Sequence, residues 1–453
     1  MGEFEKNKNN LNETELLKAE RSEDTQNNKI DNKQENYRFM KEVIKEKPVN
    51  IRKLLLKGAG LLAGAVAFGL VSAFVFVHFL PIFQEKSEKT SKIVFEEDEP
   101  LDVAAPTPAP AEEQQTAETA SLPAAENVED MTLDTYQEIY DQMNAIAKET
   151  MHCVVTVTGI SSSEDWFNIT TESIRQASGV IVAESNREYY ILTEYRTVDK
   201  VDRIMITFPD GSLADGRYQM HDPNTGLTIL KVDMDDLTSD CIANVMIATL
   251  GNSYEIQQGE AVIAIGSPMG YSNSIVHGQV TSTTSTVSAY DVQYNLLITN
   301  ILGSSNGSGI LADLDGNVIG IIAQKFSDEN SKNVITGLPI SQLKSLISVL
   351  SNNGQIPYLG IKGQNVTTEI SKQTGMPKGI YVNELDLDSP ALQAGIQKAD
   401  IIIEYDGKSV ETMYQYSENL SKGSPGDVVD VTVMRKGAEG YVEFEFQVTL
   451  GNR

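Results

Sequence analysis

The sequence predicts a mainly β protein with a membrane-spanning helix before its folded part and a small α+β domain after it. Three observations support this prediction: an uncharged run at 58–83, many short β-branched segments from Cys153 onward, and strands mixed with helices after residue 355. A chain of 453 residues is longer than one hydrophobic core usually organises. We therefore expect several folded units joined by linkers.

Residues 58–83 are predicted to form a transmembrane helix. They carry no formal charge, and the run is longer than the roughly 20 apolar residues that span a bilayer. Lys and Arg are frequent before the run, whereas acids follow it at 96–99. By the positive-inside rule, 1–57 lies in the cytoplasm and the later domains lie outside the cell membrane. A cleaved signal peptide is the alternative, but a long polar tail precedes the run and no small-residue cleavage site follows.

Two segments lack the composition of a packed core. The cytoplasmic tail, 1–57, begins with many Asn, Lys, Glu and Gln residues, and we expect it to be disordered. Residues 84–130 combine acids with Ala, Pro and Thr, which is typical of an extended, self-repelling stalk. The folded units are therefore expected in 131–354 and 355–453.

The strongly acidic composition argues against nucleic acid as a binding partner. The formal net charge is −28 and the isoelectric point is near 4.5, whereas nucleic-acid binding needs a basic surface. The four histidines are scattered, and neither a zinc-type spacing nor a nucleotide-binding loop occurs. We expect no nucleic-acid partner, metal site or cofactor. Cys153 and Cys241 are the two cysteines, and unpaired buried thiols are favoured over the disulfide that the outer side would permit.

The first folded unit, 131–354, is predicted to be a β-barrel or sandwich between two helices. Apolar residues recur at three- and four-residue steps over 131–151, which indicates an amphipathic helix. Short β-branched runs separated by Gly, Pro, Asn and Asp follow from Cys153. A second helix should begin near residue 340 and end at Gly354, a residue suited to a left-handed cap.

The second unit, 355–453, mixes strands with two candidate helices, one over 389–396 and one within 410–420. Ordered motifs run through both units: SGVIV, ILTEYRTV, HDPNTGLTILKV, GEAVIAIGSPMG, HGQVTST and NGSGILADLDGNVIGI, and then YLGI, GIYVNELDLDSPALQAGIQKADIIIEYDGKSV and SPGDVVDVTVMRKG. In this order they show a resemblance to the HtrA (Deg) family. It implies a trypsin-like double β-barrel in 131–354, a PDZ domain in 355–453, and homotrimers formed through the protease-like domain.

The resemblance also shows that the catalytic triad is degenerate. Such a protease needs a hydroxyl nucleophile, an imidazole base and a carboxylate that orients the imidazole. In ILTEYRTV, Arg196 stands at the histidine position, and in DPNTGLTILK, Gly226 stands at the carboxylate position. A guanidinium has no acceptor lone pair and keeps its proton, so Arg196 cannot act as the base.

The nucleophile position depends on how SNGSGIL is aligned. Alignment through GILADLDGNVIGI places Gly307 there, and alignment through TNILGSSNGS places Ser308 there. We therefore expect a non-catalytic protein, with an unorthodox serine endopeptidase using Ser308 as the alternative. A substitute base could come only from a histidine elsewhere, of which His221, beside Asp222, is nearest in sequence.

The role of Arg196 has two interpretations. Its side chain could form an ion pair within the disabled cleft, with Glu194 or Asp222, or it could capture the carboxylate of a ligand. The first is favoured.

The PDZ-like unit retains the residues that peptide binding requires. In such domains a peptide adds as a strand to a sheet edge, and backbone N–H groups of a glycine-containing loop hold its terminal carboxylate. This loop matches Tyr358, Leu359, Gly360 and Ile361, although an edge strand with its turn is the alternative. The helix within 410–420 should form the other wall, with Met413 and Leu420 as candidates. The sequence thus predicts a membrane-anchored HtrA-like protein that binds peptides or protein C-termini at the cell envelope.

Overall fold

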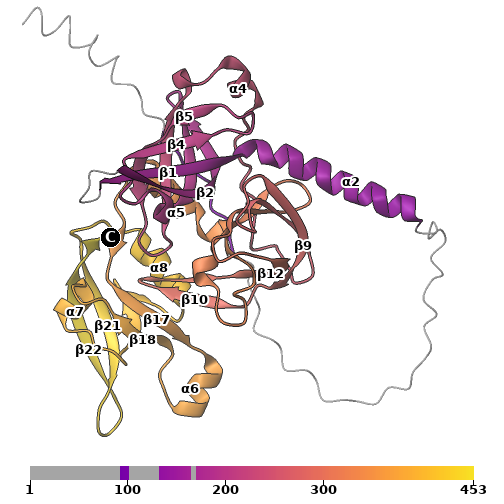
Figure 1. Ribbon diagram of the computed structural model, residues 1–453. Helices are drawn as coiled ribbons and strands as arrows, with labels where there is room; N and C mark the ends of the chain where they lie inside the picture. The colour runs from indigo at the N-terminus through magenta and orange to yellow at the C-terminus, as the bar shows by residue number, and fades with distance from the viewer. Residues whose placement is uncertain (1–91, 101–131, 165–169) are drawn as a thin grey trace, which may run out of the picture. The chain divides into compact units, whose positions relative to one another are not determined.

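The computed structural model describes residues 92–100, 132–164 and 170–453 (Figure 1). The predicted cytoplasmic tail at 1–57 and transmembrane helix at 58–83 lie outside the described residues, as does most of the predicted stalk. Within the described ranges, no helix is both long and apolar enough to cross a bilayer.

The first folded unit is built almost entirely of β-strands. Its helices are α2 (Leu133–Thr150), α3 (Tyr195–Val198), α4 (Ser239–Asn244) and α5 (Lys344–Ser351), with 3-10 turns η1 (Met151–Cys153), η2 (Met234–Asp236), η3 (Gln324–Phe326) and η4 (Ile340–Gln342). Its strands are β1 (Val154–Glu164), β2 (Thr170–Ser185), β3 (Glu188–Glu194), β4 (Arg203–Thr207), β5 (Leu213–Asp215), β6 (Arg217–His221), β7 (Leu227–Asp233), β8 (Ala261–Ser267), β9 (Ser274–Ser282), β10 (Thr286–Ala289), β11 (Val292–Asn295), β12 (Leu297–Leu302), β13 (Ser308–Ala312), β14 (Val318–Ile322) and β15 (Val334–Pro339).

These strands form two main sheets and one separate hairpin. A 7-stranded sheet has the order β5-β4-β1-β2-β3-β7-β6, and a closed barrel has the order β12-β15-β14-β13-β8-β9. Of the two barrels that the resemblance implies, the second is thus closed, and the first is a sheet with β5 and β6 as its ends. The hairpin β10–β11 belongs to neither sheet.

The second folded unit is a small α+β domain. Its elements are β16 (Pro357–Tyr358), β17 (Ile361–Val366), α6 (Thr368–Thr374), β18 (Gly379–Leu385), α7 (Pro390–Ala394), β19 (Ile401–Tyr405), β20 (Lys408–Ser409), α8 (Met413–Ser421), β21 (Val428–Lys436), β22 (Tyr441–Thr449) and β23 (Gly451–Asn452). The sheet has the order β17-β18-β19-β21-β22, with β20 on β19, and β16 pairs with β23. Both helices expected in this unit are present, as α7 and α8, and α6 is a third that the sequence pattern did not indicate.

Helix ends follow local capping chemistry. The predicted first helix is confirmed as α2, where the Thr132 side chain accepts a hydrogen bond from the N–H of Thr135 and caps the N-terminus. The helix expected to begin near residue 340 is shorter than predicted, because a 3-10 turn precedes α5. The prediction of a left-handed cap at Gly354 is wrong. Asn353 adopts that conformation instead, with φ +51°, which asparagine tolerates better than most residues.

Part of the predicted stalk packs on the first folded unit. Ile93 is buried, its N–H donates to Asn352 Oδ1 at 3.0 Å, and its carbonyl accepts from Ser348 Oγ at 2.7 Å. Asp98 forms a largely buried ion pair with Lys344 of α5, at 2.7 Å. Residues 92–100 are therefore docked against α5 and the turn that follows it.

The two cysteines are free and buried in different hydrophobic clusters, as the sequence favoured. Burial raises the pKa of Cys153 to about 12, because a thiolate loses its hydration in the core. Cys153 is therefore a core residue with little thiolate at neutral pH.

Replacing a core leucine should be far more damaging than replacing an exposed one in the same sheet. Leu192 of β3 is 1% exposed, whereas Leu213 of β5 is 57% exposed. We expect Leu192→Ala to lower the free energy of unfolding by about 2–5 kcal/mol, since it leaves a cavity. Leu213→Ala should stay within about 0.5 kcal/mol of the parent chain. Urea unfolding followed by circular dichroism measures both, and equal losses would contradict this packing.

Candidate functional site

Arg196 lies in α3, directly after strand β3, and pairs with the carboxylate before it. Arg196 Nε lies 2.5 Å from Glu194 Oε2, and a guanidinium nitrogen of Arg196 donates to Asn306 Oδ1 at 3.4 Å. Burial raises the pKa of Glu194, and the adjacent guanidinium opposes that shift. Of the two ion pairs that the sequence left open for Arg196, the structure shows the one with Glu194.

A lysine lies beside Gly226, the position that matches the carboxylate of the family. Gly226 has φ +68°, and a Cβ at this position would lie 2.9 Å from Lys325 Nζ. Lys325 Nζ donates to the carbonyl of Asn224 at 2.8 Å. The position that the resemblance aligns with an orienting carboxylate is therefore a glycine turn next to an ammonium group.

Asp222 and His221 are engaged with other partners. Asp222 is fully buried, accepts from the N–H of Thr225 at 2.8 Å, and lies 3.0 Å from Arg453 Nε as an ion pair. His221 stacks on the ring of Tyr195 with centroids 3.7 Å apart. Its Nδ1 lies 2.7 Å from the hydroxyl oxygen of Tyr218. An ion pair between Arg196 and Asp222 was the other possibility for Arg196. In the structure, Asp222 pairs with Arg453 instead.

Neither candidate nucleophile position presents a free hydroxyl. A Cβ at Gly307 would lie 2.4 Å from the carbonyl oxygen of Pro268, closer than any real contact, so this backbone does not accommodate a serine there. Ser308 begins β13 and is 1% exposed, and its Oγ accepts a hydrogen bond from the N–H of Ser178 at 2.9 Å.

The cavity beside Ser308 is very small. Its volume is about 10 Å³, which is near the minimum for a single water molecule. Glu194 is the titratable side chain among its lining residues, and that lining contains no histidine. Ser308 therefore has the surroundings of a buried structural serine.

Removing the Ser308 hydroxyl should destabilise the fold. The change leaves the buried N–H of Ser178 without its acceptor, so we expect Ser308→Ala to cost about 1–3 kcal/mol of unfolding free energy. Ser305→Ala, in the same loop but exposed, should cost less than about 0.5 kcal/mol. Thermal or urea unfolding compares them. If Ser308→Ala were as harmless as Ser305→Ala, the structural role of Ser308 would be refuted.

The loop at 358–361 is shaped as a carboxylate-binding site. Gly360 has φ +89°, and a Cβ there would lie 2.3 Å from Ser389 Cβ, so only glycine fits this turn. The turn directs three consecutive N–H groups to one point. Leu359, Gly360 and Ile361 donate to the carboxylate of Asp291 at 2.9, 2.8 and 3.1 Å.

Asp291 comes from the turn of hairpin β10–β11 in the first folded unit. It has φ +64°, a conformation that aspartate tolerates in turns, and it is 3% exposed. Its own N–H donates to the carbonyl of Ile361 at 2.7 Å, and the hydroxyl of Tyr416 in α8 donates to Asp291 Oδ1 at 2.8 Å. Burial raises the pKa of Asp291, and these hydrogen bonds act in the opposite direction.

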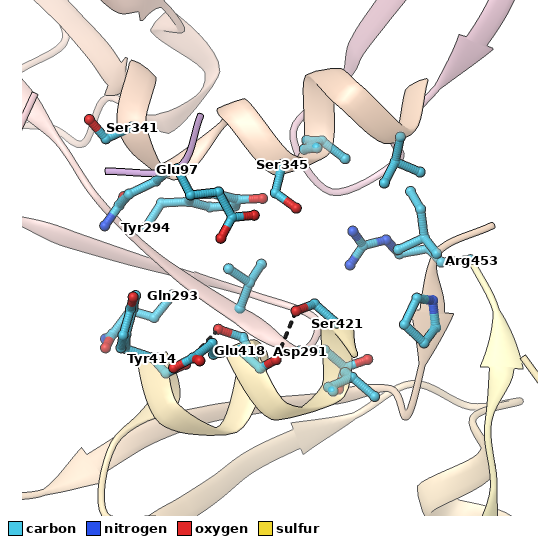
Figure 2. A pocket seen from close by; sticks show the side chains of 18 of the residues that line it. Glu97, Asp291, Gln293, Tyr294, Ser341, Ser345, Tyr414, Glu418, Ser421 and Arg453 are labelled. Carbon is cyan, nitrogen blue, oxygen red and sulfur yellow. Dashed lines mark hydrogen bonds between the residues drawn. The ribbon is translucent and has the colours of Figure 1, made fainter. Parts of the chain in front are cut away.

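Met413 and Leu420 both lie on α8, as predicted, but they are buried in the core of the second folded unit. Leu420 also lines a cavity of about 240 Å³ between α5 and α8. Figure 2 shows this cavity, with Glu97, Glu418 and Arg453 on its walls.

Asp291 is the site residue that the sequence did not indicate. An aspartate at a turn between alternating residues (TVSAYDVQYN) signals a hairpin, but nothing in that pattern reveals its partner.

Two family models match the chain. A trypsin-like peptidase domain matches residues 177–321, and a PDZ domain matches residues 357–445. The fold and the loop at 358–361 thus define a trypsin-like peptidase domain followed by a PDZ domain.

Individual relatives indicate a more specific similarity, to HtrA-type serine proteases. A probable periplasmic serine endoprotease DegP-like of Halomonas elongata is 31% identical over 281 residues, which is 61% of this chain and 56% of the relative. The serine protease Do-like HtrA of Bacillus subtilis is 30% identical over 297 residues, which is 61% of this chain and 63% of the relative. The chain is therefore similar to HtrA-type serine proteases, and its match spans less than two thirds of the length of these relatives.

A solved structure supports the same fold. The HtrA-type protease AlgW with decapeptide superposes with a TM-score of 0.53 at 21% identity, over 69% of this chain and 98% of that one. At this identity the similarity concerns the fold alone.

Proposed function

We propose that this chain is a membrane-anchored, non-catalytic HtrA-like protein that binds peptides or protein C-termini through its PDZ domain. The single observation that carries the proposal is the convergence of three backbone N–H groups on one carboxylate, at the loop of Leu359, Gly360 and Ile361. Such a loop recognises a carboxylate whatever side chain or chain end supplies it.

Loss of proton transfer supports the non-catalytic part of the proposal. The guanidinium of Arg196 has no lone pair to accept a proton, and Glu194 is already paired with it. At Gly226 an ammonium group stands where a carboxylate would orient an imidazole. Removing the serine or the histidine of a model protease lowers turnover by about a factor of 10⁶. No practical proteolysis is therefore expected.

A serine endopeptidase that uses Ser308 is the second candidate function. The observation that favours it is that the curated relatives are named as serine proteases. For catalysis, Ser308 would have to lose its hydrogen bond from Ser178, become accessible to substrate and find a base. Its burial and the small cavity beside it count against this alternative.

The membrane anchor rests on the uncharged run 58–83 and the charge asymmetry around it. With this anchor, the N-terminus lies in the cytoplasm and the two folded units lie outside the cell membrane. The periplasmic relative is consistent with that side. The homotrimer that the resemblance implies stays a prediction.

The purified full-length chain should be inert as a protease. We expect no labelling by a serine-reactive fluorophosphonate and no cleavage of reduced, unfolded casein, as seen by gel fluorescence and mass spectrometry. Labelling that disappears in Ser308→Ala would overturn the non-catalytic proposal and establish the endopeptidase alternative.

The same chain should retain peptides with a free C-terminal carboxylate. The probe is a pool of random decapeptides at millimolar total concentration, offered with free C-termini and again with amidated C-termini, and the retained fraction is measured by mass spectrometry. We expect the free pool to be enriched over the amidated pool, because amidation removes the charge that the loop recognises. Equal retention of both pools would argue against carboxylate recognition.

A further inference from the structure

The hairpin β10–β11, residues 286–295, packs where the peptide-binding groove of the PDZ domain is expected. Its strands contact β17 and α8, the two walls expected of the groove. Asp291 donates its N–H to the carbonyl of Ile361, and Ser288 Oγ donates to the carbonyl of Gly363 at 3.0 Å. We call this segment the docking hairpin.

The carboxylate of Asp291 occupies all three N–H donors of the loop at 359–361. One oxygen accepts from Leu359 and Gly360, and the other accepts from Ile361 and from the Tyr416 hydroxyl. All four donors are neutral groups, so the site holds an anion by converging dipoles and needs no basic side chain. With Asp291 in place, these N–H groups are not available to a second carboxylate.

The preceding residue, Tyr290, is also recognised by the PDZ domain. Its hydroxyl donates to Glu384 at 3.2 Å, Lys362 Nζ lies 4.3 Å from its ring centroid, and the ring of Tyr358 meets it edge-on. Arg453 donates to the carbonyl of Tyr290 at 3.1 Å. The turn is thus held by contacts with Glu384, Lys362, Tyr358 and Arg453.

We propose that Asp291 is an internal ligand that closes the PDZ groove, and that an extended peptide with a free C-terminal carboxylate binds by displacing the docking hairpin. This inference rests on the proposed peptide-binding function and describes how access of a peptide to the groove is regulated. The external partner competes for the same three N–H groups, so it is defined by a terminal carboxylate on a chain able to add beside β17.

The tether between the two domains sets the strength of this competition. Only residues 352–356 separate α5 from β16. A group held by so short a connection competes at an effective concentration on the order of millimolar. The apparent affinity for an external peptide is then reduced by the fraction of molecules in the open state.

Peptide affinity of an Asp291 variant tests the competition. Asp291→Asn removes the charge while asparagine still tolerates the left-handed turn. The full-length chain is titrated with the random decapeptide pool with free C-termini and with the amidated pool. We expect Asp291→Asn to bind the free pool about 10- to 100-fold more tightly than the parent chain, with no gain for the amidated pool.

A matched control is available in the PDZ domain. Asp406 also has a positive φ in a strand-connecting turn, but it is exposed. Asp406→Asn should leave the affinity for both pools unchanged. A gain in Asp406→Asn equal to that in Asp291→Asn would overturn the proposal, since the effect would then not come from the groove.

Hydrogen exchange of residues 357–366 separates failure of this inference from failure of the proposed function. Faster exchange of the Leu359, Gly360 and Ile361 amides in Asp291→Asn, together with tighter binding, supports the internal ligand. Faster exchange with no binding of the free pool by either chain supports occupancy by Asp291 but overturns the proposed peptide binding. Unchanged exchange and unchanged affinity overturn the internal ligand.

Discussion

The interaction on which this structure depends is the bond between one aspartate side chain and three consecutive backbone N–H groups. Asp291 reaches across from the first domain to Leu359, Gly360 and Ile361, whose N–H groups donate to its carboxylate at 2.9, 2.8 and 3.1 Å. These hydrogen bonds link the two domains. They also fill the carboxylate-binding loop of the PDZ domain. A single carboxylate therefore couples domain arrangement to ligand access.

The two domains differ in what their polar groups are free to do. In the trypsin-like domain, Arg196 pairs with Glu194 and Lys325 lies beside Gly226. Ser308 is buried and accepts a hydrogen bond from Ser178. In the PDZ domain, by contrast, the donors that recognise a carboxylate remain in place. The first domain supplies a ligand to the second, a use of the protease-like fold that requires shape and no proton transfer.

The fold could largely be predicted from sequence, because periodicity, turn residues and motif order report local structure. An ion pair of Arg196 with Glu194 or Asp222 was predicted, and the structure shows the one with Glu194. The role of Asp291 was not, because its partner Leu359 is 68 residues away and a turn aspartate looks the same whether it faces solvent or a groove. The burial of Ser308 likewise depends on the distant strand β2, which supplies Ser178.

The most direct measurement is the amide proton chemical shift of Leu359, Gly360 and Ile361 in the isotopically labelled full-length chain, with and without the Asp291 carboxylate. If that carboxylate accepts all three hydrogen bonds, the resonances lie far downfield in the parent chain and move upfield together in Asp291→Asn, while Asp406→Asn leaves them in place. Three resonances at the same positions in the parent chain and in Asp291→Asn would contradict the account.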